Sequence, residues 1–148
     1  MTVRSIRRWL GLGALLLALV YSALETRQPS SPGAGLPQDD EAVLQLHQAQ
    51  RSGEVVEGSG TVDRLLSDDR DGSRHQRFIL RLDSDLSLLV AHNLDLAPRI
   101  DDIEPGDRIE FRGQYEWNDQ GGVIHWTHHD PSQRRPGGWL EHRGETYR

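Results

Sequence analysis

The sequence predicts a mainly β protein, built on a small five-stranded barrel of the OB-fold type with one short helix before it. Two segments, 75–82 and 108–117, alternate apolar and polar residues, as strands with one face on a core do. The long connection between the third and fourth predicted strands, residues 93–107, matches the order of an OB-fold barrel. An immunoglobulin-like sandwich needs about seven strands, which is more than the five predicted here. The remaining alternatives are a different small barrel and an open α+β sheet.

Each predicted strand has its own signal. In 108–117 the odd positions are apolar or glycine and the even positions are polar, and the Pro105-Gly106 pair before it is typical of a type II turn. Gly58 and Gly60 in the first strand are typical of sharply bent barrel strands. The predicted strands are residues 55–66, 75–82, 86–92, 108–117 and 123–127, the last two joined by a hairpin at 118–122.

A short helix is expected over residues 41–50, ahead of the first strand. Asp39 or Asp40 supplies a carboxylate that caps such a helix, and Gly53 follows its end. Its predicted apolar face consists of Ala42, Val43, Leu46 and Ala49.

The chain divides into three predicted parts, residues 1–24, 25–39 and 40–148. Three arginines precede the uncharged run Trp9–Leu24, a pattern typical of a secretory signal peptide or of a retained membrane anchor. Residues 25–39 are rich in proline, serine and glycine, as flexible linkers are. We therefore expect the domain at 40–148 to be periplasmic or secreted, or held at the inner membrane through Trp9–Leu24.

The composition limits the chemistry of the chain. There is no cysteine, so a disulfide framework, a thiol nucleophile and a thiolate metal site are excluded. All 17 basic residues are arginine, and after residue 24 fourteen of them stand against 23 acidic residues, a formal charge of −9 with histidine neutral. This acidity argues against general nucleic-acid binding, although it leaves room for a local basic groove.

Arginines and aromatic rings indicate a binding face. Arg77, Arg81 and Arg112 fall at the outward positions of their predicted strands. OB barrels use such a face, with rings for stacking, to hold oligonucleotides or oligosaccharides. We expect the ligand surface near these arginines, rimmed by His92, His125 and Trp126.

The histidines give a second hypothesis. Without cysteine, histidine and carboxylate are the remaining ligands for a transition metal such as zinc. Such ligands predict a metal-dependent hydrolase, with phosphodiesters as candidate substrates, in which an arginine stabilises the developing negative charge. Two other interpretations stay open: imidazoles that fix loops by bonding backbone carbonyls, and a pH-responsive site. The candidate ligands are His75, His92, His125, His128, His129 and Asp130.

Five segments carry a specific pattern: DDRDGSRHQRFIL from Asp68, LLVAHNLDLAPRI from Leu88, GDRIEFRGQYEWN from Gly106, GGVIHWTHHDP from Gly121 and GGWLEHRGETY from Gly137. Together they resemble the bacterial domain-of-unknown-function family 3465, over about residues 54–147. The resemblance implies a small protein with an N-terminal signal or anchor, and it implies no activity, substrate or cofactor. The chain departs from the family pattern at Gln114, where an acid is expected, and near Arg135, where a histidine is expected, which weakens any site that needs those groups.

Taken together, these patterns favour an exported binding or envelope-associated module whose ligand the sequence does not identify, with the metal-dependent hydrolase as the alternative.

Overall fold

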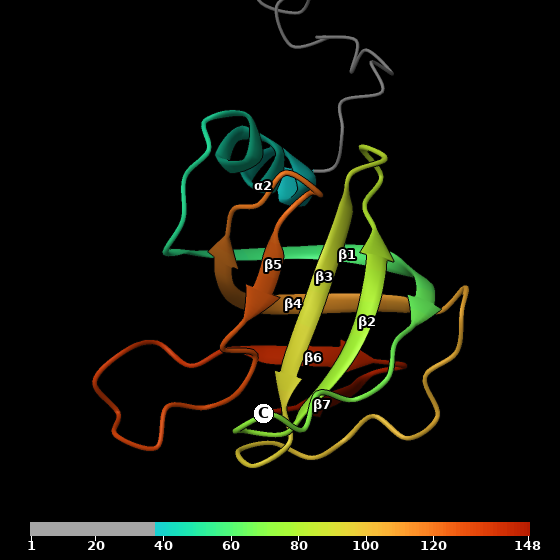
Figure 1. The fold of residues 1–148 in the computed structure, drawn as a ribbon, viewed down its shortest axis with the longest axis vertical. Coiled ribbons are helices and arrows are strands. Elements are labelled where there is room, and N and C mark those ends of the chain that lie inside the picture. The colour runs from blue at the N-terminus through green and yellow to red at the C-terminus, as the bar shows by residue number, and fades with distance from the viewer. Residues whose placement is uncertain (1–37) are drawn as a thin grey trace, which may run out of the picture. The chain divides into compact units, whose positions relative to one another are not determined.

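The computed structural model describes residues 38–148, shown as the coloured ribbon in Figure 1. The predicted signal or anchor segment at 1–24, and all but the end of the predicted linker at 25–39, lie outside the described residues. Across residues 38–148, no helix has both the length and the apolar character needed to cross a bilayer.

Five strands close into a barrel (Figure 1). They follow the order β1-β2-β3-β5-β4, and β4 pairs back with β1. β3 and β5 are parallel, and the other pairings in the ring are antiparallel. This is the order expected of an OB-fold barrel, so the predicted fold class is confirmed. The barrel strands are β1 (Glu54–Leu65), β2 (His75–Arg81), β3 (Ser87–Asn93), β4 (Arg108–Glu116) and β5 (Val123–His125).

The core lies inside the barrel, where the alternation predicts it. Every second side chain of β2, β3 and β4 is buried, because successive side chains of a strand point to opposite faces. Trp117, one residue beyond β4, packs against the core and is only partly buried. The fully buried apolar side chains of the barrel strands are Phe78, Leu80, Leu88, Val90, Ile109, Phe111, Tyr115 and Ile124.

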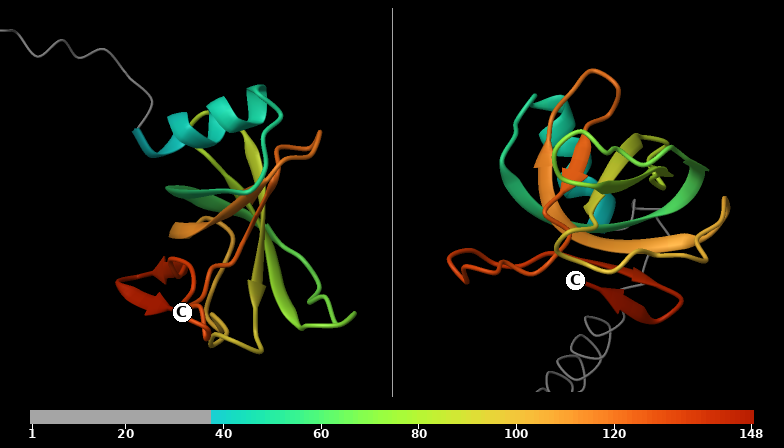
Figure 2. Two further views of the ribbon diagram at one scale, coloured as in Figure 1. Left: turned by 90° about the vertical axis from the view of Figure 1, so that its left-hand side faces the viewer. Right: turned by 60° about the horizontal axis from the view of Figure 1, so that its bottom comes forward.

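β1 curves round the barrel (Figure 2), as its two glycines predict. A Cβ at position 58 would lie 2.7 Å from the Phe111 ring, so glycine lets this ring stay in the core. The register of β1 against β2 shifts between Val62 and Arg64. Such a bulge increases the local bend, and it lies where β1 passes from its pairing with β4 to its pairing with β2.

The helix α2 (Gln38–Gln48) covers one end of the barrel (Figure 2). It begins and ends earlier than the predicted 41–50. Asp39 and Asp40 lie inside the helix, and the Asp40 carboxylate accepts the Ser84 amide of the β2–β3 turn at 2.9 Å instead of capping the helix. The backbone turns out of the helix at Gln50, which has φ 52°. Val43 is fully buried and Leu46 packs against the core. The other two residues of the predicted apolar face, Ala42 and Ala49, are exposed.

The connection between β3 and β4 covers the other end of the barrel with its buried side chains Ala97, Ile100 and Ile103. It finishes in the predicted turn: the Asp107 amide donates to the Glu104 carbonyl at 3.1 Å, and Gly106 has φ 96°. A positive φ at this position is what a type II turn requires.

Two further strands, which the sequence pattern does not predict, follow the barrel. β6 (Trp139–His142) and β7 (Glu145–Tyr147) form a hairpin with Arg143 and Gly144 at its turn, both at positive φ. β6 pairs with the first half of β4 while β5 pairs with its end. The two strands therefore lie one after the other along the same edge of β4.

Candidate functional site

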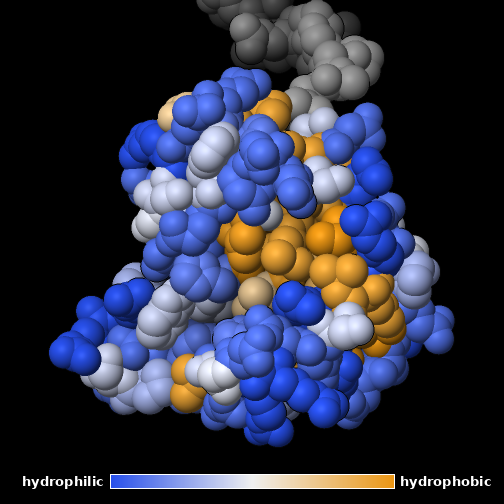
Figure 3. Space-filling view, viewed as in Figure 1, coloured by the Kyte–Doolittle hydropathy of each residue, from blue (hydrophilic) through white to orange (hydrophobic). Residues whose placement is uncertain are grey.

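The outward side chains of β2, β3 and β5 form one continuous surface, which we call the outer face. Ile79 of β2 lies opposite Leu89 of β3, and Leu89 lies beside Val123 of β5. These side chains are partly exposed, and Figure 3 shows hydrophobic surface gathered over this side of the molecule with hydrophilic surface around it. The outer face consists of Arg77, Ile79, Leu89, Ala91, Val123 and His125.

Two of the three predicted arginines belong to this surface. Arg77 lies on it and donates through Nε to the Ser67 carbonyl at 3.0 Å, and Arg81 lies at its edge, 3.3 Å from Asp63 Oδ1. Arg112 does not join them. It lies on β4, where it pairs with Glu57 of β1 and donates to the Gly137 carbonyl at 3.1 Å.

His125 and Trp126 lie at the other side of the outer face, where β5 ends. His125 Nε2 is 3.4 Å from Glu116 Oε1. Trp126 has φ 55°, an uncommon conformation for a bulky residue. Its ring lies 4.9 Å from the His128 ring, and the Arg135 guanidinium carbon lies 4.3 Å from the indole centroid. Arg135 and His128 therefore already contact the indole that was expected to stack on a ligand.

His92 is fully buried rather than placed at an exposed rim. Its Nε2 lies 3.0 Å from the Pro98 carbonyl, and its Nδ1 lies 2.8 Å from the Thr127 hydroxyl. Because a carbonyl can only accept, Nε2 carries the proton and Nδ1 accepts from Thr127. Burial is the main cause that lowers the pKa of His92 from its ordinary 6.5 to about 4.

The remaining predicted metal ligands are not gathered round one point. His75 starts β2, His128 is buried with Nδ1 2.7 Å from the His129 carbonyl, and His129 is exposed. Burial lowers the pKa of His128. Among residues 38–148 there is no group of three or more histidine, aspartate or glutamate side chains that could hold a metal ion.

Asp130 is the last of the predicted metal ligands, and its carboxylate is used by the backbone of its own loop. Oδ1 accepts the Ser132 amide and hydroxyl at 2.9 and 2.7 Å, and Oδ2 accepts the amides of Arg134 and Arg135. These donors, with Ser132 first, hold the pKa of Asp130 far below its usual range. His92, His128 and Asp130 thus make the loop-fixing contacts that one interpretation of the sequence predicts.

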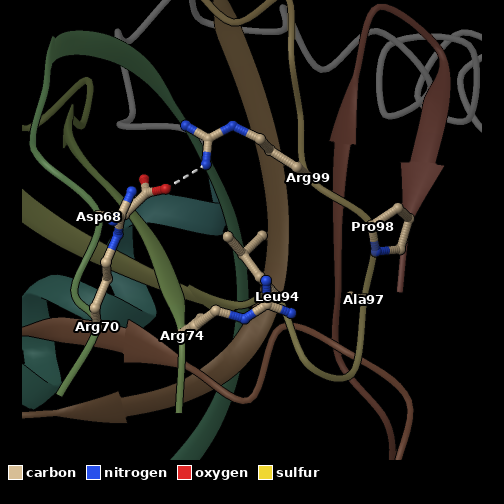
Figure 4. A pocket seen from close by; sticks show the side chains of 7 residues that line it. All are labelled: Asp68, Arg70, Arg74, Leu94, Ala97, Pro98 and Arg99. Atoms are coloured by element: carbon tan, nitrogen blue, oxygen red, sulfur yellow. Dashed lines mark hydrogen bonds and ion pairs between the residues drawn. The ribbon is translucent and has the colours of Figure 1, made fainter. Parts of the chain in front are cut away.

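A pocket of about 540 Å³ lies at the end of the barrel where β2 begins and β3 ends. Arg70 and Arg74 from the β1–β2 loop form one side, and Arg99 reaches from the β3–β4 connection to Asp68, with Nη1 2.6 Å from Oδ2 (Figure 4). Leu94, Ala97 and Pro98 supply the apolar part of the lining.

The sequence matches the family described as "Protein of unknown function (DUF3465)" over residues 30–148. The chain belongs to the DUF3465 family. The match covers the whole barrel and the β6–β7 hairpin, so the resemblance seen in the sequence segments is confirmed. No curated protein matches the sequence.

The DUF3465 barrel also contains polar residues for which the sequence suggested no role. Gln76 is buried and makes two bonds to one residue: Nε2 donates to the Ile100 carbonyl at 2.8 Å, and Oε1 accepts the Ile100 amide at 3.0 Å. The sequence does contain a signal for this role, because Gln76 is a polar residue at an inward position of β2, in line with the apolar residues Phe78 and Leu80. The pocket arginines had no such signal, since they lie in loops without periodicity.

His142, on β6, is the second such residue of the DUF3465 domain. It is buried, with Nε2 2.9 Å from Asp107 Oδ2 and Nδ1 3.4 Å from Asp102 Oδ1. Arg143 pairs with both aspartates. The Glu104 amide, then His142 and Arg143, lower the pKa of Asp107. This cluster fastens the β6–β7 hairpin to the segment that precedes β4.

Proposed function

We propose that this protein is an exported, non-catalytic binding module whose ligand surface is the outer face. One observation carries the proposal: the centre of this sheet face is aliphatic and accessible to solvent, with Ile79, Leu89 and Val123 aligned across three strands. Contiguous apolar surface on a small soluble domain marks an interaction site, because leaving it in water is unfavourable. Export is supported by the sequence pattern at 1–24.

The chemistry of the outer face favours a polypeptide segment as the occupant. Its central side chains are aliphatic, so they offer no ring on which a base or a sugar could stack. Aliphatic side chains of a partner bury well against such a surface, and an extended segment places alternate side chains on it.

The charges around the outer face favour an acidic partner. Arg64, Arg77 and Arg81 lie along its β1–β2 side, and Asp63 pairs with Arg64 and Arg81. Arg77 has no carboxylate partner among the described residues. We therefore propose a polypeptide segment that carries both apolar and acidic side chains.

Peptide binding to the full-length protein tests this function. We expect a blocked octapeptide that alternates leucine with aspartate to shift the amide resonances of β2, β3 and β5, and one that alternates leucine with lysine to bind at least several-fold more weakly. Leu89→Glu should abolish the binding, because it places a charge at the centre of the aliphatic row. Val55→Glu is the matched control, since Val55 is 46% exposed on β1 outside the outer face.

Two results would refute the proposal. One is equal loss of binding in the Leu89→Glu and Val55→Glu variants. The other is binding of oligothymidylate or of a chitooligosaccharide on these strands where neither peptide binds, which would favour the stacking hypothesis.

A further inference from the structure

The pocket between the β1–β2 loop and the β3–β4 connection is a second site, independent of the outer face. Its apolar wall is held in place by buried polar side chains. Gln76 bonds both backbone groups of Ile100, and His92 bonds the Pro98 carbonyl. The Leu94 amide donates to the Arg74 carbonyl at 2.8 Å, which joins the two walls. The pocket shape is therefore set before any ligand arrives, which lowers the entropic cost of binding.

Three guanidinium groups in this pocket keep unused donors. Arg74 bonds Asp95 through Nε at 2.9 Å, and Arg99 bonds Asp68 through Nη1 and approaches Asp101 through Nε. Arg70 has no hydrogen-bond partner within residues 38–148. Each arginine has five N–H donors in a planar fork, so most of these donors remain available to an anion.

We propose that this pocket binds a small organic phosphate monoester. A phosphate monoester offers three terminal oxygens to the three arginines that line the pocket, whereas a carboxylate offers only two oxygens. The organic part lies against Leu94, Ala97 and Pro98. A volume of about 540 Å³ is in the range of small-molecule sites and exceeds the size of phosphate alone.

The acidic surroundings restrict the ligand to a short one. Asp68 lines the pocket, and Asp95 and Asp101 flank it on the other wall. These carboxylates would repel the neighbouring phosphates of a polynucleotide, whereas a monoester has a single phosphate group to place beside the arginines. The pocket therefore selects one phosphate group over a chain of them.

Isothermal titration of the full-length protein tests this site with four probes: phenyl phosphate, inorganic phosphate, benzoate and benzyl alcohol. We expect phenyl phosphate to bind most tightly, inorganic phosphate and benzoate more weakly, and benzyl alcohol not at all. Arg70→Ala and Arg74→Ala should each weaken phenyl phosphate binding by roughly tenfold, since each removes charge-assisted hydrogen bonds. Arg70 makes no hydrogen bond or ion pair to another side chain among the described residues, so its variant remains informative if Arg74→Ala unfolds.

Arg51→Ala is the matched control, because Arg51 is a surface arginine paired with Glu54 away from the pocket. It should leave the affinity within about twofold. The proposal is overturned if Arg51→Ala weakens binding as much as Arg70→Ala, if benzyl alcohol binds as well as phenyl phosphate, or if benzoate does.

Discussion

Replacing His92 by glutamine should change how the stability of the domain depends on pH. In the folded protein the pKa of His92 is about 4, because its fully buried imidazole is costly to charge, whereas in the unfolded chain it has its ordinary value of 6.5. Between these values the unfolded state binds more protons, so stability falls as the pH falls. The linkage relation gives a loss of about 2 kcal/mol by pH 5 and about 3 kcal/mol by pH 4, relative to neutral pH.

Urea unfolding at a series of pH values from about 7.5 to 4 measures how the free energy of unfolding depends on pH. This is roughly the range in which a histidine with a lowered pKa titrates. The His92→Gln variant should be less stable at neutral pH, since the bonds to Pro98 and Thr127 are disturbed, but its stability should fall less steeply with acid. Contributions from His128 and from the carboxylates cancel in the comparison because both proteins contain them. If the two proteins lose stability in parallel between neutral pH and pH 5, His92 does not titrate as argued.

Two further substitutions, each paired with a control substitution, test how the structure is held together. Gln76→Leu leaves the buried amide and carbonyl of Ile100 without partners and should cost about 3 kcal/mol in urea unfolding. Gln45→Leu, on the exposed side of α2, should cost less than about 0.5 kcal/mol, and equal losses would contradict the role of Gln76. Gly138→Ala places a Cβ 1.9 Å from the Trp126 carbonyl and should cost about 3 kcal/mol or more, measured by thermal unfolding. Gly144→Ala is the control: its Cβ meets open space, but the backbone has φ 81°, so it should cost about 1–2 kcal/mol. A smaller loss of stability for Gly138→Ala than for Gly144→Ala would show that the close approach of the Trp126 carbonyl does not restrict position 138.

The barrel could be predicted from the sequence because its signals are local. Alternation assigned the inward residues of β2 and β4, and the length of the β3–β4 connection identified the strand order. The β6–β7 hairpin was missed because each strand is too short for a clear alternation. Its stability comes from pairing with β4 and from the His142 cluster, which joins residues 35 positions apart in sequence.

The site could be predicted only where strand parity, the alternation of inward and outward positions along a strand, decides which way a side chain points. Parity placed Arg77 and Arg81 outward on β2, and β2 carries them to the outer face. Parity also put Arg112 outward on β4, but the closed ring places β1 between β4 and β2, which separates Arg112 from the other two. His92 was expected at the rim of the ligand surface, but it lies at an inward position of β3 and is buried by the same alternation that places Val90 in the core. The pocket is formed by two loops whose approach depends on tertiary bonds such as Gln76 to Ile100, which no local pattern contains.

The placement of β5 and β6 along one edge of β4 has a practical use. The backbone leaves the sheet after His125 and rejoins it at Trp139, and both points are fixed by ladder bonds to the same strand. Extra residues inserted between Arg135 and Pro136 would lengthen an excursion whose ends are already anchored and would leave the Asp130 bonds to the amides of Ser132, Arg134 and Arg135 in place. Doubling a flexible loop costs only about 0.6 kcal/mol. This position is therefore suited to carrying a reporter tag or an epitope while the barrel keeps its register.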